Sequence, residues 1–117
     1  MTLEQIANEL NLTVITASHK LSLEVKRGYA SDLMSHVMSH AREGDLWVTV
    51  QVHPNTVAIA ALLDLGGIII SENKELEKET IEKAALEEIP LFTTPLSTFT
   101  IVGRLYEMGI KGSEEEE

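Results

Sequence analysis

Side chains able to bind a ligand gather in three short stretches of the sequence, residues 51–56, 71–73 and 93–98. They are neutral hydrogen-bonding groups: Gln51, His53, Asn55, Thr56, Ser71, Asn73, Thr94, Ser97 and Thr98. Such groups suit a nucleotide, a small anion or a polar metabolite better than they suit proton transfer. Ser, Thr and Asn also cap helices in any protein, so capping alone is the alternative interpretation. We expect ligand binding at these stretches and no catalytic residue.

Sequence motifs for catalysis or phosphate binding are absent. Neither G-x-x-x-x-G-K-[ST] nor G-x-G-x-x-G occurs, and no serine is framed by glycines in G-x-S-x-G. His53 with Ser97 or Thr98 could form a nucleophile pair, but no carboxylate to orient the imidazole is evident. A minor enzymatic or kinase-like activity at His53 and Ser97 therefore remains the alternative to binding.

One candidate metal site is visible in the sequence. Asp32, His36 and His40 recur every four residues and would share one face of a helix. Two imidazoles at this spacing can chelate a divalent cation. The alternative is a helix face without a metal, either exposed to solvent or part of a protein interface, on which Asp32 favours the start of the helix electrostatically.

Composition limits the functions that the chain can have. The 117 residues carry a formal net charge of -10, and a field of that sign repels nucleic acids and anionic lipid head groups. The longest apolar runs fall far short of a membrane span, and the first residues show no signal or transit peptide. Cysteine is absent, which excludes disulfides and thiolate chemistry. We expect a cytoplasmic protein with no cofactor, no nucleic acid partner and no membrane association.

Five strands are predicted from β-branched and alternating patterns, at residues 12–16, 21–25, 46–50, 68–70 and 91–93. Residues 21–25 alternate apolar and polar side chains, which is typical of a half-buried strand near a sheet edge. The run Ile68 to Ile70 is typical of a strand covered on both faces.

Helices are predicted between these strands. Thr2 and Gln5 form a capping box for a helix over residues 3–10. Residues 29–31 should turn the chain into the helix with the two histidines, and a mostly apolar helix should cover residues 57–65. Asn73 should cap a charged helix that ends at Glu88. Thr94 and Pro95 should open the last helix, with Leu96, Phe99, Val102 and Tyr106 facing inward.

The alternation of strands and helices predicts an α/β fold of three layers, a mostly parallel, Rossmann-like sheet with helices on both faces. The length allows one domain, expected over residues 1–112, followed by a disordered acidic tail at 113–117. In such sheets ligands bind beyond the carboxyl ends of the strands. The three polar stretches follow strands, so we expect them to meet there.

Several segments resemble the DRTGG domain family, and the likeness covers nearly all of residues 1–112. They are Gly28–Ser35, Gly44–Asn55, Pro95–Phe99 and Gly103–Tyr106. The likeness is closest to small stand-alone members, some of them found near iron hydrogenase genes and labelled by similarity to HPr kinase. In larger proteins the domain accompanies CBS domains in pyrophosphatases or precedes phosphate acetyltransferase domains. Its fold is likened to the amino-terminal domain of HPr kinase.

The resemblance implies a regulatory or dimerising role without an activity of its own, in a homodimer or beside a larger hydrogenase-related or metabolic enzyme. The chain departs from the family pattern at two places. Leu46 follows Asp45 where members often carry arginine, and residues 71–73 replace a Thr-Gly-Gly turn. Glu72 in that turn would repel phosphate. Our main hypothesis is a non-catalytic module that senses a ligand or docks on an enzyme, and a structural dimerisation scaffold is the further alternative.

Overall fold

The computed structural model describes residues 1–115. In chain order the elements are α1 (Leu3–Leu10), β1 (Thr13–Thr16), η1 (Ser18–Lys20), β2 (Gly28–Ala30), α2 (Met34–His40), β3 (Leu46–Thr49), α3 (Pro54–Leu63), β4 (Gly67–Ile70), α4 (Lys78–Glu87), β5 (Leu91–Thr93), α5 (Thr98–Glu107) and η2 (Ser113–Glu115). Strands and helices alternate from β2 to α5, as the sequence predicts.

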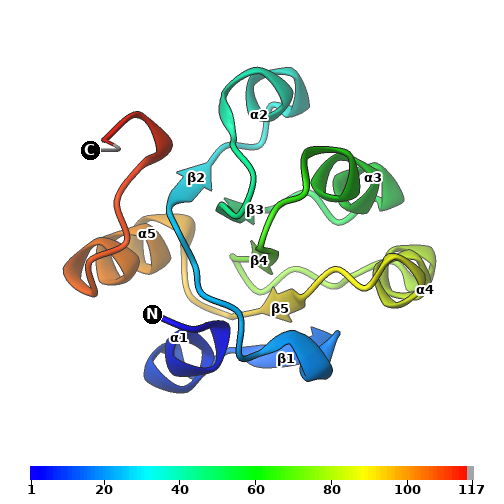
Figure 1. The fold of residues 1–117 in the computed structure, drawn as a ribbon. Coiled ribbons are helices and arrows are strands. Elements are labelled where there is room, and N and C mark those ends of the chain that lie inside the picture. Colours follow the sequence, from blue (N-terminus) through cyan, green and yellow to red (C-terminus); the bar gives the residue numbers. More distant parts are fainter. Residues whose placement is uncertain (116–117) are drawn as a thin grey trace.

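The strands form one five-stranded sheet in the order β1-β5-β4-β3-β2 (Figure 1). Strands β2, β3, β4 and β5 run parallel, and β1 pairs antiparallel with β5 at one edge. Strand β2 forms the other edge. The prediction of a mostly parallel α/β sheet is therefore confirmed.

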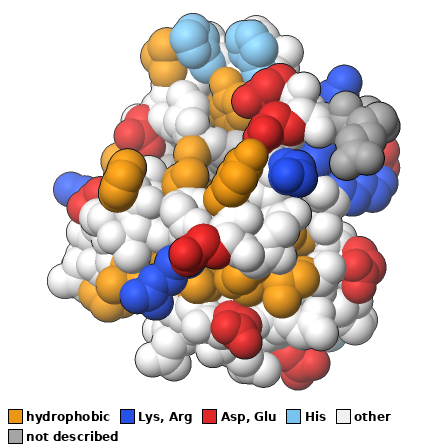
Figure 2. Space-filling model, turned by 90° about the vertical axis from the view of Figure 1, so that its left-hand side faces the viewer, with side chains coloured by type: hydrophobic (Ala, Val, Ile, Leu, Met, Phe, Trp, Pro, Cys, Tyr) orange, Lys and Arg blue, Asp and Glu red, His pale blue; other side chains and the backbone are white. Residues whose placement is uncertain are grey.

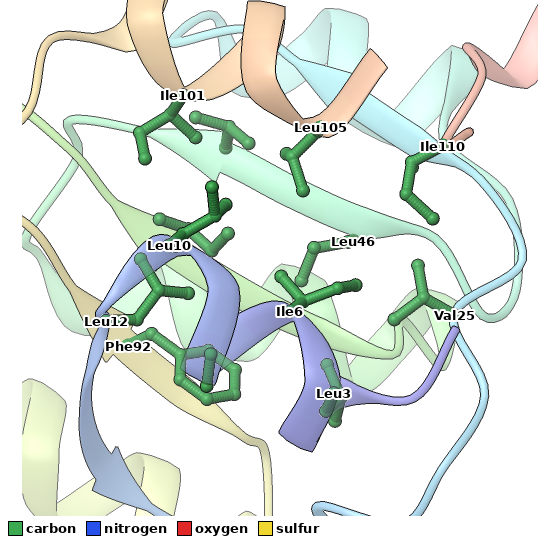
Figure 3. Packing of buried hydrophobic residues seen from close by; sticks show 13 residues of the cluster. Leu3, Ile6, Leu10, Leu12, Val25, Leu46, Phe92, Ile101, Leu105 and Ile110 are labelled. Atoms are coloured by element: carbon green, nitrogen blue, oxygen red, sulfur yellow. The ribbon is translucent and has the colours of Figure 1, made fainter. Parts of the chain in front are cut away.

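Helices cover both faces of the sheet, with α1 and α5 on one side and α2, α3 and α4 on the other (Figure 1). The three consecutive isoleucines of β4 alternate between the layers because successive strand side chains point to opposite faces. Ile69 packs in the α1/α5 layer, while Ile68 and Ile70 pack against the opposite helices. Figure 3 shows Ile101 and Leu105 of α5 descending onto the first of these cores.

The start of the chain folds as expected, but the segment after β1 does not. Thr2 and Gln5 form the predicted capping box at α1. The prediction of a sheet strand at residues 21–25 is wrong. These residues instead bond the beginning of the chain, with Leu3 N donating to Leu23 O and Val25 N to Met1 O. The edge strand lies at residues 28–30, where a turn was predicted.

The last two helices begin later than the caps predict. Helix α4 starts at Lys78 with Glu77 at its N-cap, so the predicted Asn73 cap is wrong. Helix α5 starts at Thr98 and is capped by Ser97, whose hydroxyl accepts from Thr100 N. The hydroxyl of Thr94 accepts from Leu96 N in a turn before the helix.

The inward face of α5 also differs from the prediction. Ile101 and Leu105 are buried against the sheet, while Phe99 is 89% exposed, Tyr106 51% and Val102 38%. Apolar residues occur on nearly every side of this helix, so their spacing fits either orientation. The sheet selects the Ile101 and Leu105 face, so the other three predicted inward residues of the helix form an outward stripe. Leu96, which precedes the helix, packs against the core as predicted.

Two further features bear on the site. The expected disordered tail does not hold for residues 113–115, which form η2 with Ser113 buried; Glu116 and Glu117 lie outside the described residues. Trp47 on β3 is fully buried, and its indole Nε1 donates to Ser31 O at 2.9 Å. Within residues 1–115 no helix has the length and apolarity needed to cross a bilayer.

Candidate functional site

The polar loops after β3, β4 and β5 lie at the carboxyl end of the parallel strands. These three strands are parallel neighbours, so Gln51, Ser71 and Thr94, which follow them, lie at the same end. The three polar stretches therefore lie at the same end of the sheet, as the sequence predicts. Hydrogen bonds divide them into two halves, one around β4 and β5 and the other around β2 and β3.

The β4/β5 half is joined across the two loops. The hydroxyls of Ser71 and Thr98 lie 2.6 Å apart, and Asn73 N donates to Thr94 O at 3.0 Å. Ser71 and Thr94 are buried, while Asn73 is exposed. The buried hydroxyls of Ser71 and Thr94 therefore bond neighbouring residues of the loops, and Asn73 is exposed.

Glu72 fills the position at which an anion would meet α5. Its Oε2 accepts from Thr98 N, the first amide of the helix, at 2.8 Å. Free amides at a helix start attract anions, and here a carboxylate of the chain itself takes that role. Glu72 and Asn73 both have positive φ, 68° and 56°, which favours glycine. The turn thus keeps a backbone suited to glycines while carrying an acidic side chain.

The β2/β3 half is organised by Asp32, which the sequence assigns to a helix face. Its Oδ1 accepts from Thr49 Oγ1 and from Val50 N, both at 2.9 Å. Gln51 Nε2 donates to the carbonyl of Asp32 at 2.9 Å. These bonds tie the loop after β2 to the loop after β3.

The turn into α3 presents the exposed members of the predicted set. His53 is the N-cap residue, and its Nδ1 accepts from Asn55 N at 3.2 Å. Thr56 is buried, and its hydroxyl donates to Gln51 O at 3.1 Å. His53 and Asn55 are both exposed residues.

The pair required for the alternative catalytic hypothesis is not formed. His53 is bonded to Asn55, while Ser97 Oγ donates to Thr100 Oγ1 at 3.1 Å. Strand β4 lies between the strands that lead to the two loops. His53 is therefore not positioned to activate Ser97 in this arrangement.

The structure separates the three predicted metal ligands. Helix α2 begins at Met34, and Asp32 lies before it and turns to the end of β3. His36 and His40 remain neighbours, with ring centroids 5.7 Å apart and His40 Nδ1 2.9 Å from His36 O. Within residues 1–115 no group of three potential ligands could hold a metal ion. The predicted site of Asp32, His36 and His40 is therefore wrong as a three-ligand centre.

The sequence analysis did not predict a groove that lies beside β2, the edge strand of the sheet opposite β1. A cavity of about 280 Å³ opens between β2, α5 and the C-terminal residues. Its lining is Gly28, Tyr29, Ala30, Val48, Val102, Leu105, Tyr106, Ile110, Lys111, Gly112, Glu114 and Glu115. Apolar side chains of β3 and α5 line it together with polar and charged groups from the C-terminal residues. Figure 2 looks onto this side of the molecule and shows apolar side chains exposed between charged ones.

Hydrogen bonds of Glu115 shape the rim of the groove. Its Oε1 accepts from the Tyr106 hydroxyl at 2.9 Å and its Oε2 from Gly112 N at 3.1 Å. The bond from Gly112, reinforced by the one from Tyr106, lowers the pKa of Glu115. The same contact with Glu115 raises the pKa of Tyr106. Lys111 Nζ lies 5.4 Å from the centre of the Tyr106 ring on the same rim.

A buried carboxylate anchors the C-terminal residues that form this rim. Asp45 is fully buried, and its Oδ1 accepts from Arg27 Nε at 2.9 Å. Its Oδ2 accepts from Arg42 N at 2.8 Å and from the hydroxyl of Ser113. A buried charge needs such partners, so Asp45 stabilises the start of β2 and η2 together. The Gly44–Asp45 pair is the signal in the sequence that could have pointed to this anchor.

Comparison with known proteins agrees with this fold. The DRTGG domain profile matches residues 5–108. Among solved structures, the chain resembles the CBS and DRTGG domains of the regulatory region of Clostridium perfringens pyrophosphatase, complexed with the activator diadenosine tetraphosphate. That match has a TM-score of 0.74 and 19% sequence identity, and it covers 99% of this chain and 50% of that one. The chain thus spans about half of that structure, and the likeness establishes the fold. No curated protein sequence shows a significant match.

Proposed function

The chain belongs to the DRTGG domain family, and from this premise we propose that it is a non-catalytic regulatory module that acts by binding a small polar ligand or a partner protein. The similar pyrophosphatase structure comes from a regulatory region and contains a nucleotide activator. For the present chain, ligand sensing and docking on a hydrogenase-related or metabolic enzyme are both consequences of this proposal.

One observation carries the proposal: several polar groups at the carboxyl end of the strands form hydrogen bonds within the loops and hold them in place. The hydroxyls of Ser71, Thr98 and Thr56 and the Nδ1 of His53 all bond neighbouring residues. Catalysis needs a base next to the group that it activates. Binding needs only a rigid rim with some polar groups left at the surface, and His53, Asn55 and Asn73 provide these.

The carboxylate of Glu72 restricts which ligand this end of the sheet would take. A phosphate at the start of α5 would have to displace Glu72 from Thr98 N and then lie beside a negative charge. We therefore propose a ligand that places a neutral polar group, such as a nucleoside base or sugar, against His53, Asn55 and Asn73. A nucleotide would have to direct its phosphates away from α5.

A thermal-shift screen over nucleosides, nucleotides, inorganic phosphate and polar metabolites tests this function. A ligand that binds only the folded state increases the free energy of unfolding by about 2.7 kcal/mol at a hundredfold excess over its Kd, and this raises the melting temperature. We expect a neutral polar ligand to do so without turnover, and Asn55→Ala to weaken the effect. Glu82→Ala, at an exposed position of α4, is the surface control.

Two results would contradict the proposal. Product formation that disappears in His53→Ala would favour the enzymatic alternative. Stabilisation of the wild type by inorganic phosphate, unchanged in Glu72→Gln, would show that Glu72 does not control the start of α5.

The scaffold alternative has its own observation, the outward stripe of α5. Phe99, Val102 and Tyr106 lie three and four residues apart and form an exposed apolar row. Exposed apolar patches of this kind mark interaction surfaces, and a homodimer is one way to cover them. Analytical ultracentrifugation of Phe99→Glu against wild type tests it. A mass that stays monomeric in both proteins would remove this candidate.

A further inference from the structure

Strand β2 leaves backbone hydrogen-bonding groups open at the edge of the sheet. In its parallel pairing with β3, Arg27 O accepts from Leu46 N and Ser31 N donates to Val48 O. The alternation along such a ladder turns the amide and carbonyl of Ala30 outward. Residues 1–115 provide no hydrogen bond to these two groups. Exposed edges of this kind accept another extended segment.

The chain itself demonstrates pairing at this edge. Gly112 forms an isolated parallel bridge with Gly28, and Gly28 N donates to Lys111 O at 2.8 Å. The C-terminal residues then turn away into η2, because Ser113 is held by Asp45. The pairing therefore stops before Ala30, although the edge continues.

The groove runs alongside this open part of the edge. Val102 and Leu105 of α5 and Val48 of β3 provide apolar lining next to Ala30. Its volume of about 280 Å³ lies just below the ~300–1,000 Å³ of small-molecule sites. A space of that size beside an open strand suits one or two side chains of an extended segment.

Charge at the rim selects the kind of segment. Glu114 and Glu115 both line the groove, whereas Lys111 is the cation there and lies over the ring of Tyr106. Glu115 already has two hydrogen-bond donors, but Glu114 has no hydrogen bond or ion pair within residues 1–115. The whole chain carries a net charge of -10. Basic side chains are the complement of this rim.

We propose that the β2 edge and its groove bind an extended segment of a partner protein in which basic and apolar residues alternate. The segment adds a strand at Ala30, inserts an apolar side chain against Val102 and Leu105, and places a basic side chain next to Glu114. Main-chain bonds supply part of the affinity and the alternating side chains supply specificity. This inference rests on the proposed binding function and identifies its partner class and surface.

An end-blocked peptide in which lysine alternates with valine is the probe, with a glutamate–valine peptide as its counterpart. NMR titration of the full chain should shift the amides of Ala30 and Val102 with the lysine peptide. Glu114→Lys should weaken binding by roughly tenfold, and more at low salt than at high salt. Val102→Arg should abolish it by filling the groove. Glu75→Lys, an exposed charge reversal outside the groove, is the matched control and should bind as wild type does.

Each result decides the proposal. Equal binding of both peptides, an unchanged affinity in Glu114→Lys, or shifts centred on His53 instead of Ala30 would overturn it. A dimer in ultracentrifugation that Val102→Arg disrupts would show that a second copy fills the groove. If the peptide fails while a polar ligand still stabilises the protein, this inference is lost and the proposed function survives; if neither binds, both fail.

Discussion

Replacing Ser113 with alanine tests whether the C-terminal residues are part of the folded domain. Ser113 is buried, and its hydroxyl donates to the fully buried carboxylate of Asp45. The change removes one of three described donors to that carboxylate and leaves Arg27 Nε and Arg42 N in place. It also releases η2, because the Tyr106 bond to Glu115 is exposed and weak by comparison.

The expected loss follows from these contacts. A hydrogen bond to a charged group contributes about 1.5–3 kcal/mol, and the lower half applies here because Asp45 keeps two donors. Total stabilities of natural domains are about 5–15 kcal/mol. A loss of about 1.5–2 kcal/mol would lower Tm by about 5–12 °C for a domain of this size. Asp45→Asn should cost more, because it removes the charge that Arg27 is paired with.

Urea denaturation of the two single variants and the double variant measures these quantities. Ser113→Ala should shift the midpoint with an unchanged m-value, and the double-mutant cycle should give a coupling energy above about 0.5 kcal/mol. Glu114→Ala is the matched control within the same turn and should be neutral. A Ser113→Ala variant within about 0.5 kcal/mol of wild type would refute the anchoring role of Asp45.

Further outcomes are expected from other contacts. Ile101→Ala should cost about 2–5 kcal/mol in urea denaturation, whereas Phe99→Ala should change stability by less than about 0.5 kcal/mol. Ala17→Gly should increase the free energy of unfolding by up to about 1 kcal/mol in the same assay, because Ala17 has a φ of 59°, which favours glycine. Glu115→Gln should return the pKa of Tyr106 toward the ordinary tyrosine range in an NMR titration of the ring. Because the folded-state pKa of Glu115 is lowered, the contribution of this carboxylate to stability is present above the ordinary glutamate range and is lost as pH falls through the folded-state pKa. The NMR shift of the Gly112 amide, which bonds Glu115, should therefore change in acid.

Local patterns were sufficient where the chain's own neighbours decide its structure. The capping box of Thr2 and Gln5 and the apolar run at Ile68 to Ile70 depend on a few adjacent residues, and both appear as predicted. The alternation of strands and helices was enough for the parallel sheet, since short connections leave few other topologies. The placement of the polar loops at one end of the sheet followed from that topology.

Tertiary contacts decided the parts that were mispredicted. Helix α5 is apolar on several sides, so the choice of Ile101 and Leu105 as its buried face depends on the sheet beneath it. Residues 21–25 have a strand pattern, yet their partners are the first residues of the chain. Ser113 precedes a run of glutamates, which made the tail look disordered; its burial depends on a carboxylate 68 positions away.

The candidate site was predictable in its residue types but not in its use. The neutral polar side chains were identified, but spacing alone does not reveal that Ser71 bonds Thr98 or that Glu72 occupies the start of α5. Asp32 illustrates the limit, because its regular spacing to the histidines predicted a shared helix face. Its bond to Thr49 is a long-range contact that no local pattern encodes.

The burial of Trp47 gives the protein a built-in optical reporter. It is the chain's one tryptophan, it has no exposed surface, and it is paired in register with Tyr29 of β2. An indole shielded from water emits at shorter wavelength than a hydrated one, so unfolding should shift its fluorescence to the red. Because its Nε1 donates to Ser31, directly after β2, emission intensity should also respond when the edge is occupied, without any label.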